Sequence, residues 1–120
     1  MDAAYVFRVR FRLDPQGVRV DPAAFETVLR KPAPDPGEDG WTFFRDALWR
    51  GEVADEAHLR ERFADVLGVA VTDVTFSELE ADQEYLDALD DAIEADLDAF
   101  NANGVREARH KYLGSSIRVV

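Results

Sequence analysis

The stretch YVFRVRFRL, residues 5–13, alternates apolar and mostly basic side chains along its length. Successive side chains of a β-strand point to opposite faces of the sheet, so this pattern is typical of a strand with one face on a core. The apolar face carries Tyr5, Phe7, Val9, Phe11 and Leu13, and the other face carries Val6, Arg8, Arg10 and Arg12. The segment therefore predicts a half-buried β-strand.

The two segments after this strand are less uniform. DPQG, residues 14–17, predicts a turn. In DPAAFETVLRK, residues 21–31, Asp21 suits a helix cap and Pro22 suits the first helical position. The β-prone residues of FETVL, 25–29, suit a strand after one helical turn equally well. Both structures stay open for this segment.

A loop at residues 31–40, rich in proline and glycine, leads into the segment WTFFRDALWRG. A helix over residues 41–50 is favoured over a strand, because it separates apolar from charged side chains. Gly51 then lies where helices commonly end. Trp49 falls on the polar face, four residues after Arg45 and within reach of a cation–π contact with it.

The remainder of the chain alternates further helices with strands. The patterns predict helices at 55–68, 82–100 and 105–113, and strands at 74–79 and 115–120. Asp55 caps the first of these helices and Gly68 ends it. A change of alternation at Thr72 and Asp73 predicts a turn or bulge before the next strand. The apolar stripe of the helix at 55–68 predicts burial of Leu59, Phe63, Val66 and Leu67.

Strands interrupted by several helices indicate an α+β fold, with a small, mostly antiparallel sheet of three or four strands and helices packed on one face. The long connections between strands also permit a ferredoxin-like plan. A chain of 120 residues suits one domain, so residues 1–120 are predicted to form a single α+β domain.

The charge of the chain is strongly negative. There are 25 Asp and Glu against 14 Lys and Arg, a formal net charge of −11, and Lys31 and Lys111 are the only lysines. An acidic face can attract a basic partner, but it can also be an adaptation to concentrated salt, where the screening length falls to about 3 Å at 1 M. Because a partner-binding face need not deplete the whole chain of lysine, salt adaptation is the favoured interpretation.

The sequence contains no cysteine, which excludes disulfides, thiolate nucleophiles, zinc sites built on thiolates and iron–sulfur clusters. The first ten residues do not follow the pattern of a secretion signal, and no segment approaches the roughly 20 apolar residues of a membrane helix. We therefore expect a cytoplasmic protein with no membrane partner.

Two stretches carry a resemblance to a known family. GWTFFRDALWRGEV, residues 40–53, contains the letters LWR at Leu48, Trp49 and Arg50, and the chain ends in KYLGSSIRVV, residues 111–120. On these motifs the chain resembles the LWR-salt proteins of halophilic archaea, and the resemblance runs over the whole chain. The resemblance implies a halophilic archaeal cytoplasm with high potassium. It implies no activity, ligand or catalytic residue.

No pattern of residues predicts a catalytic, metal or cofactor site. Eleven acidic residues and no base lie between Asp73 and Asp98, but they spread along a convex surface, whereas a metal site needs oxygens that converge on one point. His58 and His110 are far apart in sequence and are expected at the surface. We therefore expect a protein without catalytic residues, bound metal or cofactor.

Arg8, Arg10 and Arg12 form a row on one face of the first strand and are candidates for anion contacts. Sheet faces that combine arginines with aromatic residues can bind single-stranded nucleic acid. Here the aromatic residues lie on the opposite face, and a net charge of −11 repels a polyanion. Nucleic acid is therefore a disfavoured partner, and ion pairing with the acidic helix predicted at 82–100, or with a partner, is favoured for this row.

Five large apolar side chains lie within the nine residues 41–49, more than one short helix face usually buries. A helix over this segment places Phe44 and Leu48 in the core and leaves Trp49 outside. Tryptophan and arginine are enriched at binding hot spots. The predicted contact surface consists of Trp41, Arg45, Trp49 and Arg50. The alternative, that the large apolar side chains of this segment fill the core of a small domain, stays open.

These observations favour a non-enzymatic binding or assembly module of a halophile. Its expected partner is a second copy of the chain or another protein. The alternative is a nucleic-acid-binding or anion-binding protein that uses the arginine row of the first strand.

Overall fold

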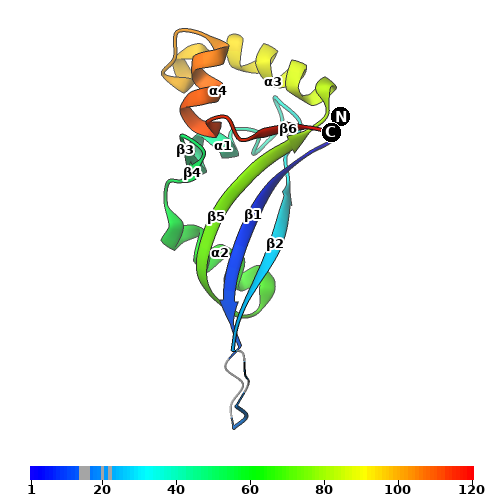
Figure 1. Cartoon of the computed structure of the whole chain (residues 1–120). Helices are drawn as coiled ribbons and strands as arrows, with labels where there is room; N and C mark the ends of the chain where they lie inside the picture. The colour runs from blue at the N-terminus through cyan, green and yellow to red at the C-terminus, as the bar shows by residue number, and fades with distance from the viewer. Residues whose placement is uncertain (14–16, 20, 22) are drawn as a thin grey trace.

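The alternating segment forms the long strand β1 in the interior of the sheet (Figure 1). The computed structural model describes residues 1–13, 17–19, 21 and 23–120, so most of the turn predicted at 14–17, and Pro22, lie outside the described residues. The elements are β1 (Ala3–Arg12), β2 (Ala24–Pro32), α1 (Phe43–Ala47), β3 (Leu48–Trp49), β4 (Glu52–Val53), α2 (Glu56–Leu67), β5 (Ala70–Ala81), α3 (Gln83–Glu94), the 3₁₀ helix η1 (Leu97–Phe100), α4 (Val105–Leu113) and β6 (Ile117–Val119).

The main sheet has four strands in the order β2-β1-β5-β6, and β3 and β4 form a separate small ribbon. β1 is antiparallel to both β2 and β5, whereas β6 is parallel to β5. The predicted α+β class, with a mostly antiparallel sheet, is therefore confirmed. The strand order differs from the ferredoxin-like plan, because β1 pairs directly with β2, whereas a helix separates the first two strands of that plan.

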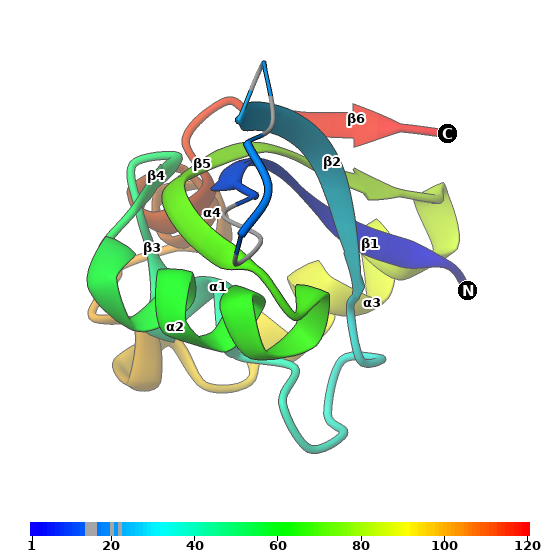
Figure 2. The ribbon, with the colours of Figure 1, turned by 90° about the horizontal axis from the view of Figure 1, so that it is seen from below.

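The apolar face of β1 is the centre of the core, as its alternation predicts. Tyr5, Phe7 and Val9 are fully buried. The Phe7 ring lies 5.2 Å from that of Phe63 on α2 and 5.6 Å from that of Phe76 on β5. Figure 2 shows the helices on one side of the curved sheet. Arg8, Arg10 and Arg12 on the opposite face of β1 are exposed, whereas Val6 on that face is buried.

β5 contains the irregularity predicted at Thr72 and Asp73. Arg10 of β1 is paired with Asp73 and Phe11 with Val71, so Thr72 is an extra residue in β5. A second register shift lies farther along the strand, where Val6 pairs with Glu78 and Phe7 with Phe76. These shifts change which side chains of β5 face the core, so a single alternating pattern does not run through the strand.

The segment for which the sequence leaves both helix and strand possible forms a strand. Ala24–Pro32 forms β2 along the full length of β1, and the rings of Phe11 and Phe25 stack 5.6 Å apart. β-branched and aromatic residues fit a pleated surface, and here the neighbouring strand provides that surface.

α2 has the caps that the sequence predicts but buries less of its stripe. The Asp55 side chain accepts a hydrogen bond of 3.1 Å from the His58 N–H, and Gly68 ends the helix. Leu59 and Phe63 are buried, but Val66 is 74% and Leu67 is 37% exposed. The prediction of burial is therefore wrong for Val66 and Leu67, because no described element covers the last turn of the helix.

The helix predicted over residues 82–100 is interrupted. α3 ends at Glu94, and the 3₁₀ helix η1 follows at Leu97–Phe100. Acidic residues at the C-terminal end of a helix interact unfavourably with its dipole, which disfavours a continuous helix through Asp96 and Asp98. The break allows Phe100 to turn fully into the core.

α4 and its end at Gly114 agree with the prediction. None of the helices in the described residues is both long and apolar enough to cross a membrane.

Candidate functional site

The segment predicted as one helix over residues 41–50 forms a short helix followed by a hairpin. α1 ends at Ala47, and β3 then pairs with β4. Arg50 and Gly51 connect these strands with φ of 52° and 78°, and a two-residue turn of type I′ requires positive φ at both positions. The helix prediction is therefore wrong beyond Ala47, and Gly51 belongs to a turn and not to the end of a helix.

This turn satisfies backbone groups at the end of α4. The N–H of Arg50 donates to the carbonyl of Lys111 at 2.8 Å, and the N–H of Gly51 donates to the carbonyl of Tyr112 at 2.9 Å. The last carbonyls of a helix have no partner within the helix. The LWR stretch and the C-terminal KYLGSS stretch, which are far apart in sequence, are therefore one structural unit.

Two glycines allow this close approach. A Cβ atom on Gly51 would lie 3.1 Å from the carbonyl oxygen of Leu113, and a Cβ atom on Gly114 would lie 3.1 Å from that of Arg50. Both glycines also have positive φ, 78° and 62°, which side chains disfavour. Backbone therefore packs against backbone at this contact.

The Gly114→Ala variant is expected to lower the free energy of unfolding by about 1–3 kcal/mol, the range for a strained backbone position, and to do so through two causes. The alanine would have to adopt a positive φ, and its Cβ would press on the Arg50 carbonyl. Gly68→Ala is the matched control, because Gly68 has φ of 72° but open space around its Cβ position. Denaturant unfolding should show the larger loss for Gly114→Ala. Equal losses would mean that the close approach contributes nothing.

The core assignments within this segment are confirmed. Phe44 and Leu48 are each 1% exposed, whereas Trp49 is 45% exposed. The rings of Phe44 and Phe100 are nearly parallel, with an angle of 6° and centroids 5.6 Å apart. Because Phe100 belongs to η1, this stack joins α1 to a segment that lies more than fifty residues later in the chain.

The four residues of the predicted contact surface lie in two neighbouring clusters. In the first, Trp41 packs on Phe100 at 5.6 Å, and the Arg45 guanidinium lies 5.8 Å from the same ring. Arg45 also forms an ion pair with Asp46 at 2.9 Å. The cation–π contact predicted between Arg45 and Trp49 is wrong, because the helix that would have brought them together ends at Ala47.

The second cluster surrounds the half-exposed ring of Trp49. The Arg50 guanidinium and the Lys111 ammonium each lie 5.6 Å from this ring, and the Tyr112 ring meets it edge to face at 6.1 Å. The Tyr112 ring is also 6.4 Å from that of Phe100, which connects the two clusters. Trp49 therefore offers a rigid aromatic face with cations beside it.

The arginine row lies on the open face of the sheet, where Arg10 pairs with an acidic residue of β2 and not with the acidic helix predicted as the partner of the row. Arg8, Arg10 and Arg12 are exposed, and Arg10 forms an ion pair with Glu26 at 3.3 Å. On the same face Arg30 forms an ion pair with Glu80, and the hydrogen bond from Arg30 holds the pKa of the Glu80 carboxyl below its ordinary value. The face carries mixed charge and not a continuous basic surface.

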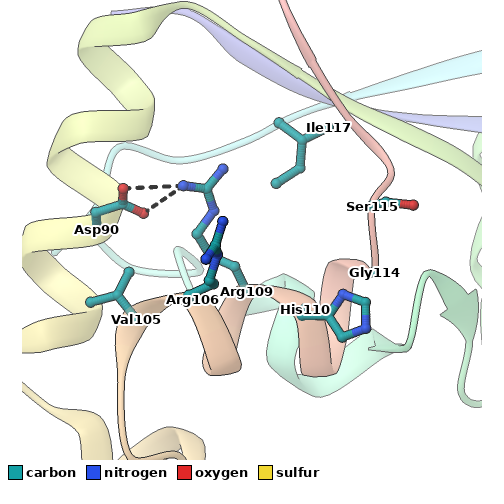
Figure 3. Close-up of a pocket in the computed structure, with 8 residues that line it drawn as sticks. All are labelled: Asp90, Val105, Arg106, Arg109, His110, Gly114, Ser115 and Ile117. Atoms are coloured by element: carbon teal, nitrogen blue, oxygen red, sulfur yellow. Dashed lines mark hydrogen bonds and ion pairs between the residues drawn. The ribbon is translucent and has the colours of Figure 1, made fainter.

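A pocket of about 540 Å³ lies between α3, α4 and β6 (Figure 3). Both carboxylate oxygens of Asp90 on α3 accept hydrogen bonds of 3.1 Å from Nη1 of Arg109 on α4. The side chain of Arg106 extends beside that of Arg109 in Figure 3, and no dashed line joins it to another residue drawn. The lining residues are Asp90, Val105, Arg106, Arg109, His110, Gly114, Ser115 and Ile117.

Helical spacing explains why the bases line one pocket. Residues three and four positions apart share a helix face, so Arg106, Arg109 and His110 lie together on α4. Ala108, Tyr112 and Leu113 are buried on the side of the helix that faces the core.

This pocket is not predicted from the sequence, although the composition of α4 contains a signal for it. Three of the 14 Lys and Arg residues and one of the two histidines lie within the nine residues of α4. In a chain of net charge −11, such a local concentration of bases is unusual and indicates an anion-binding surface on this helix. Within the described ranges, no group of three or more histidine or acidic side chains is arranged to hold a metal ion.

Comparisons with known proteins identify the family. Neither the curated proteins nor the solved structures contain a match to the chain. A family model described as LWR-salt protein matches residues 1–120, the whole chain. The stretches that carried the resemblance, LWR and KYLGSS, are the two that meet at Gly51 and Gly114. The chain therefore belongs to the LWR-salt protein family.

Proposed function

We propose that the chain is a non-enzymatic binding module that holds a small organic anion in the pocket between α3, α4 and β6. The observation that carries this proposal is the presence of two guanidinium groups, those of Arg106 and Arg109, in one pocket of a strongly acidic chain. Guanidinium groups form forked hydrogen bonds with carboxylates and phosphates.

The two arginines have different parts in this proposal. Asp90 holds the guanidinium of Arg109 in a fixed place, which leaves its other donors available to a ligand. Arg106 forms no ion pair within the part of the chain that the structure describes, so its positive charge is not neutralised by a carboxylate. Arg109 would therefore orient the anion, and Arg106 would supply the uncompensated charge.

The surroundings favour a small ligand with an apolar part. The volume of about 540 Å³ is within the range of small-molecule sites. Val105 and Ile117 line the pocket beside the cationic groups and offer apolar contacts. The acidic residues of α3 and the net charge of −11 repel a long polyanion, whereas a single carboxylate or phosphate group can reach the arginines.

Titration with potassium phosphate, acetate and butyrate in concentrated KCl tests this function. Amide resonances of Arg106, Arg109 and Ser115 are expected to shift on binding. Butyrate is expected to bind more tightly than acetate, because each buried methylene group contributes about 0.8 kcal/mol.

A matched pair of variants locates the site. Arg106→Gln is expected to weaken binding about tenfold or more, since hydrogen bonds to charged groups contribute about 1.5–3 kcal/mol. Arg8→Gln removes the same charge from the open face of the sheet and should leave affinity unchanged. The proposal fails if none of these anions shifts the pocket resonances, or if Arg106→Gln binds as well as the unchanged protein.

The other roles expected from the sequence stay as predictions. Trp49, with its cationic neighbours, is the proposed contact for a protein partner, because a rigid aromatic ring exposed beside arginine is typical of binding hot spots. The alternative of nucleic-acid binding through Arg8, Arg10 and Arg12 can be tested in the same titration with a single-stranded oligonucleotide.

We further propose that the module works in a cytoplasm with concentrated salt. The net charge of −11 and the presence of only two lysines support this setting.

A further inference from the structure

The strand β2 forms one border of the main sheet and has no neighbouring strand on its outer side among the described residues. Figure 1 shows it along the edge of the sheet, next to β1. A long edge strand presents unpaired N–H and C=O groups, which can pair with another strand. β2 extends over nine residues, Ala24–Pro32.

The hydrogen-bond pattern shows which residues of β2 have backbone groups that point outward. The N–H of Leu13 donates to the carbonyl of Ala23 at 2.8 Å, and the N–H of Ala33 donates to that of Ala3 at 3.0 Å. In an antiparallel pair, hydrogen-bonded residues alternate with residues whose backbone groups point away. The odd-numbered residues from 23 to 33 therefore bond to β1, and the backbone groups of Glu26, Val28 and Arg30 point outward.

We propose that β2 pairs with β2 of a second copy of the chain in antiparallel orientation, with Val28 on the two-fold axis. This pairing joins two four-stranded sheets into one continuous sheet. Val28 lies opposite Val28 of the second copy, and Glu26 lies opposite Arg30 of the second copy. The facing residues are those whose N–H and C=O groups point outward, so each facing pair can exchange two hydrogen bonds.

Charge complementarity selects this register among those that are possible. Opposite charges that face each other across strands stabilise their pairing, and like charges destabilise it. A slide of two residues in either direction separates Glu26 from Arg30 of the second copy. A slide of four residues places Glu26 against Glu26 or Arg30 against Arg30. Only the pairing centred on Val28 matches both charges at once.

The side chains on the open face continue this complementarity beyond the edge. Glu26 already bonds to Arg10 and Arg30 already bonds to Glu80, each at 3.3 Å. In the dimer these pairs would form rows of alternating sign, from Arg10 through Glu26 to Arg30 and Glu80 of the second copy. Val28, which is 52% exposed in the single chain, would be covered by its counterpart.

Charged residues also protect edge strands from unwanted pairing. A protective edge carries charges that meet like charges in a second copy. The charges of β2 have opposite sign and lie symmetrically about Val28, so they favour self-pairing.

Light scattering coupled to gel filtration, in the KCl concentration that keeps the chain folded, tests this proposal. The full chain is expected to form a particle of twice its 13.5 kDa mass. A protein that remains a monomer at the highest soluble concentration would overturn the proposal.

Two charge variants test the register. Glu26→Arg and Arg30→Glu each place like charges opposite one another, so each variant alone is expected to be a monomer. Mixed in equal amounts they should form a heterodimer, because the two arginines on the edge of one copy then face the two glutamates on the edge of the other. Glu61→Arg, which makes the same charge change on α2, should remain a dimer. Circular dichroism confirms that each variant is folded.

A backbone variant tests the edge without relying on charge. Val28→Pro removes an outward N–H that β1 does not use, so it should prevent dimerisation and retain the pairing of β1 with β2. Dimers of Val28→Pro, dimers of Glu26→Arg alone, or the lack of a heterodimer in the mixture would each overturn the proposal.

Discussion

Replacing Phe44 by alanine is expected to lower the free energy of unfolding by about 3–5 kcal/mol, the range for loss of a buried phenylalanine. Phe44 is 1% exposed, stacks on Phe100 and meets the ring of Tyr112 edge to face. Its removal would leave a cavity between α1, η1 and α4. Denaturant unfolding in concentrated KCl, followed by circular dichroism, measures the loss.

Trp49→Ala is the matched control within the same motif. Trp49 is 45% exposed, and its main contacts are the edge of Tyr112 and the cations of Arg50 and Lys111. An exposed cation–π contact contributes about 0.5–1 kcal/mol, so the loss should be about 1 kcal/mol. If Trp49→Ala destabilises the fold as much as Phe44→Ala, the proposed role of Trp49 as a contact for a partner is wrong.

Transfer from concentrated KCl to dilute buffer is expected to unfold the protein. The screening length rises from about 3 Å at 1 M salt to about 10 Å at 0.1 M, which restores the repulsion among carboxylates. Residues 61–120 carry 14 acids and 5 bases, so this repulsion is strongest in the second half of the chain. Circular dichroism at decreasing KCl concentration should show the loss of helix and sheet signals.

Two sets of variants that change the net charge in opposite directions test whether electrostatic repulsion causes the unfolding in dilute buffer. Asp91, Glu94 and Asp98 are exposed, and their replacement by Asn, Gln and Asn should lower the salt concentration required for folding. Replacing the exposed Arg8 and Arg12 by glutamine makes the chain more negative and should raise it. A fold that persists unchanged in dilute buffer would contradict salt-dependent folding.

The sequence correctly predicts those features of the fold that depend on residues close together along the chain. The alternation of residues 5–13 placed Tyr5, Phe7 and Val9 in the core, because the geometry of a strand alone assigns side chains to faces. The change of phase at Thr72 indicated a bulge for the same reason. Asp55 and Gly68 marked the ends of α2, because caps bond to backbone groups within a few residues.

The sequence-based predictions are wrong where contacts with a distant segment determine the local structure or the burial of a residue. Val66 lies on the apolar stripe of α2 but is exposed, because periodicity defines a face and not how far its partner extends. The helix predicted through Trp49 ends at Ala47, where the turn of Arg50 and Gly51 bonds to the end of α4. The turn is stabilised by hydrogen bonds to a helix that lies more than fifty residues later in the sequence.

The candidate sites differ in the same way. The negative charge, the absence of cysteine chemistry and the arginine row follow from composition or from neighbours along the chain, whereas the exposure of Trp49 is predicted from a helix that ends before this residue. Only the tertiary structure joined Asp90 to Arg109 in a pocket, opposed Gly51 to Gly114, and left β2 as a free edge. These features depend on contacts between residues that are far apart in sequence, and local propensity contains no term for such contacts.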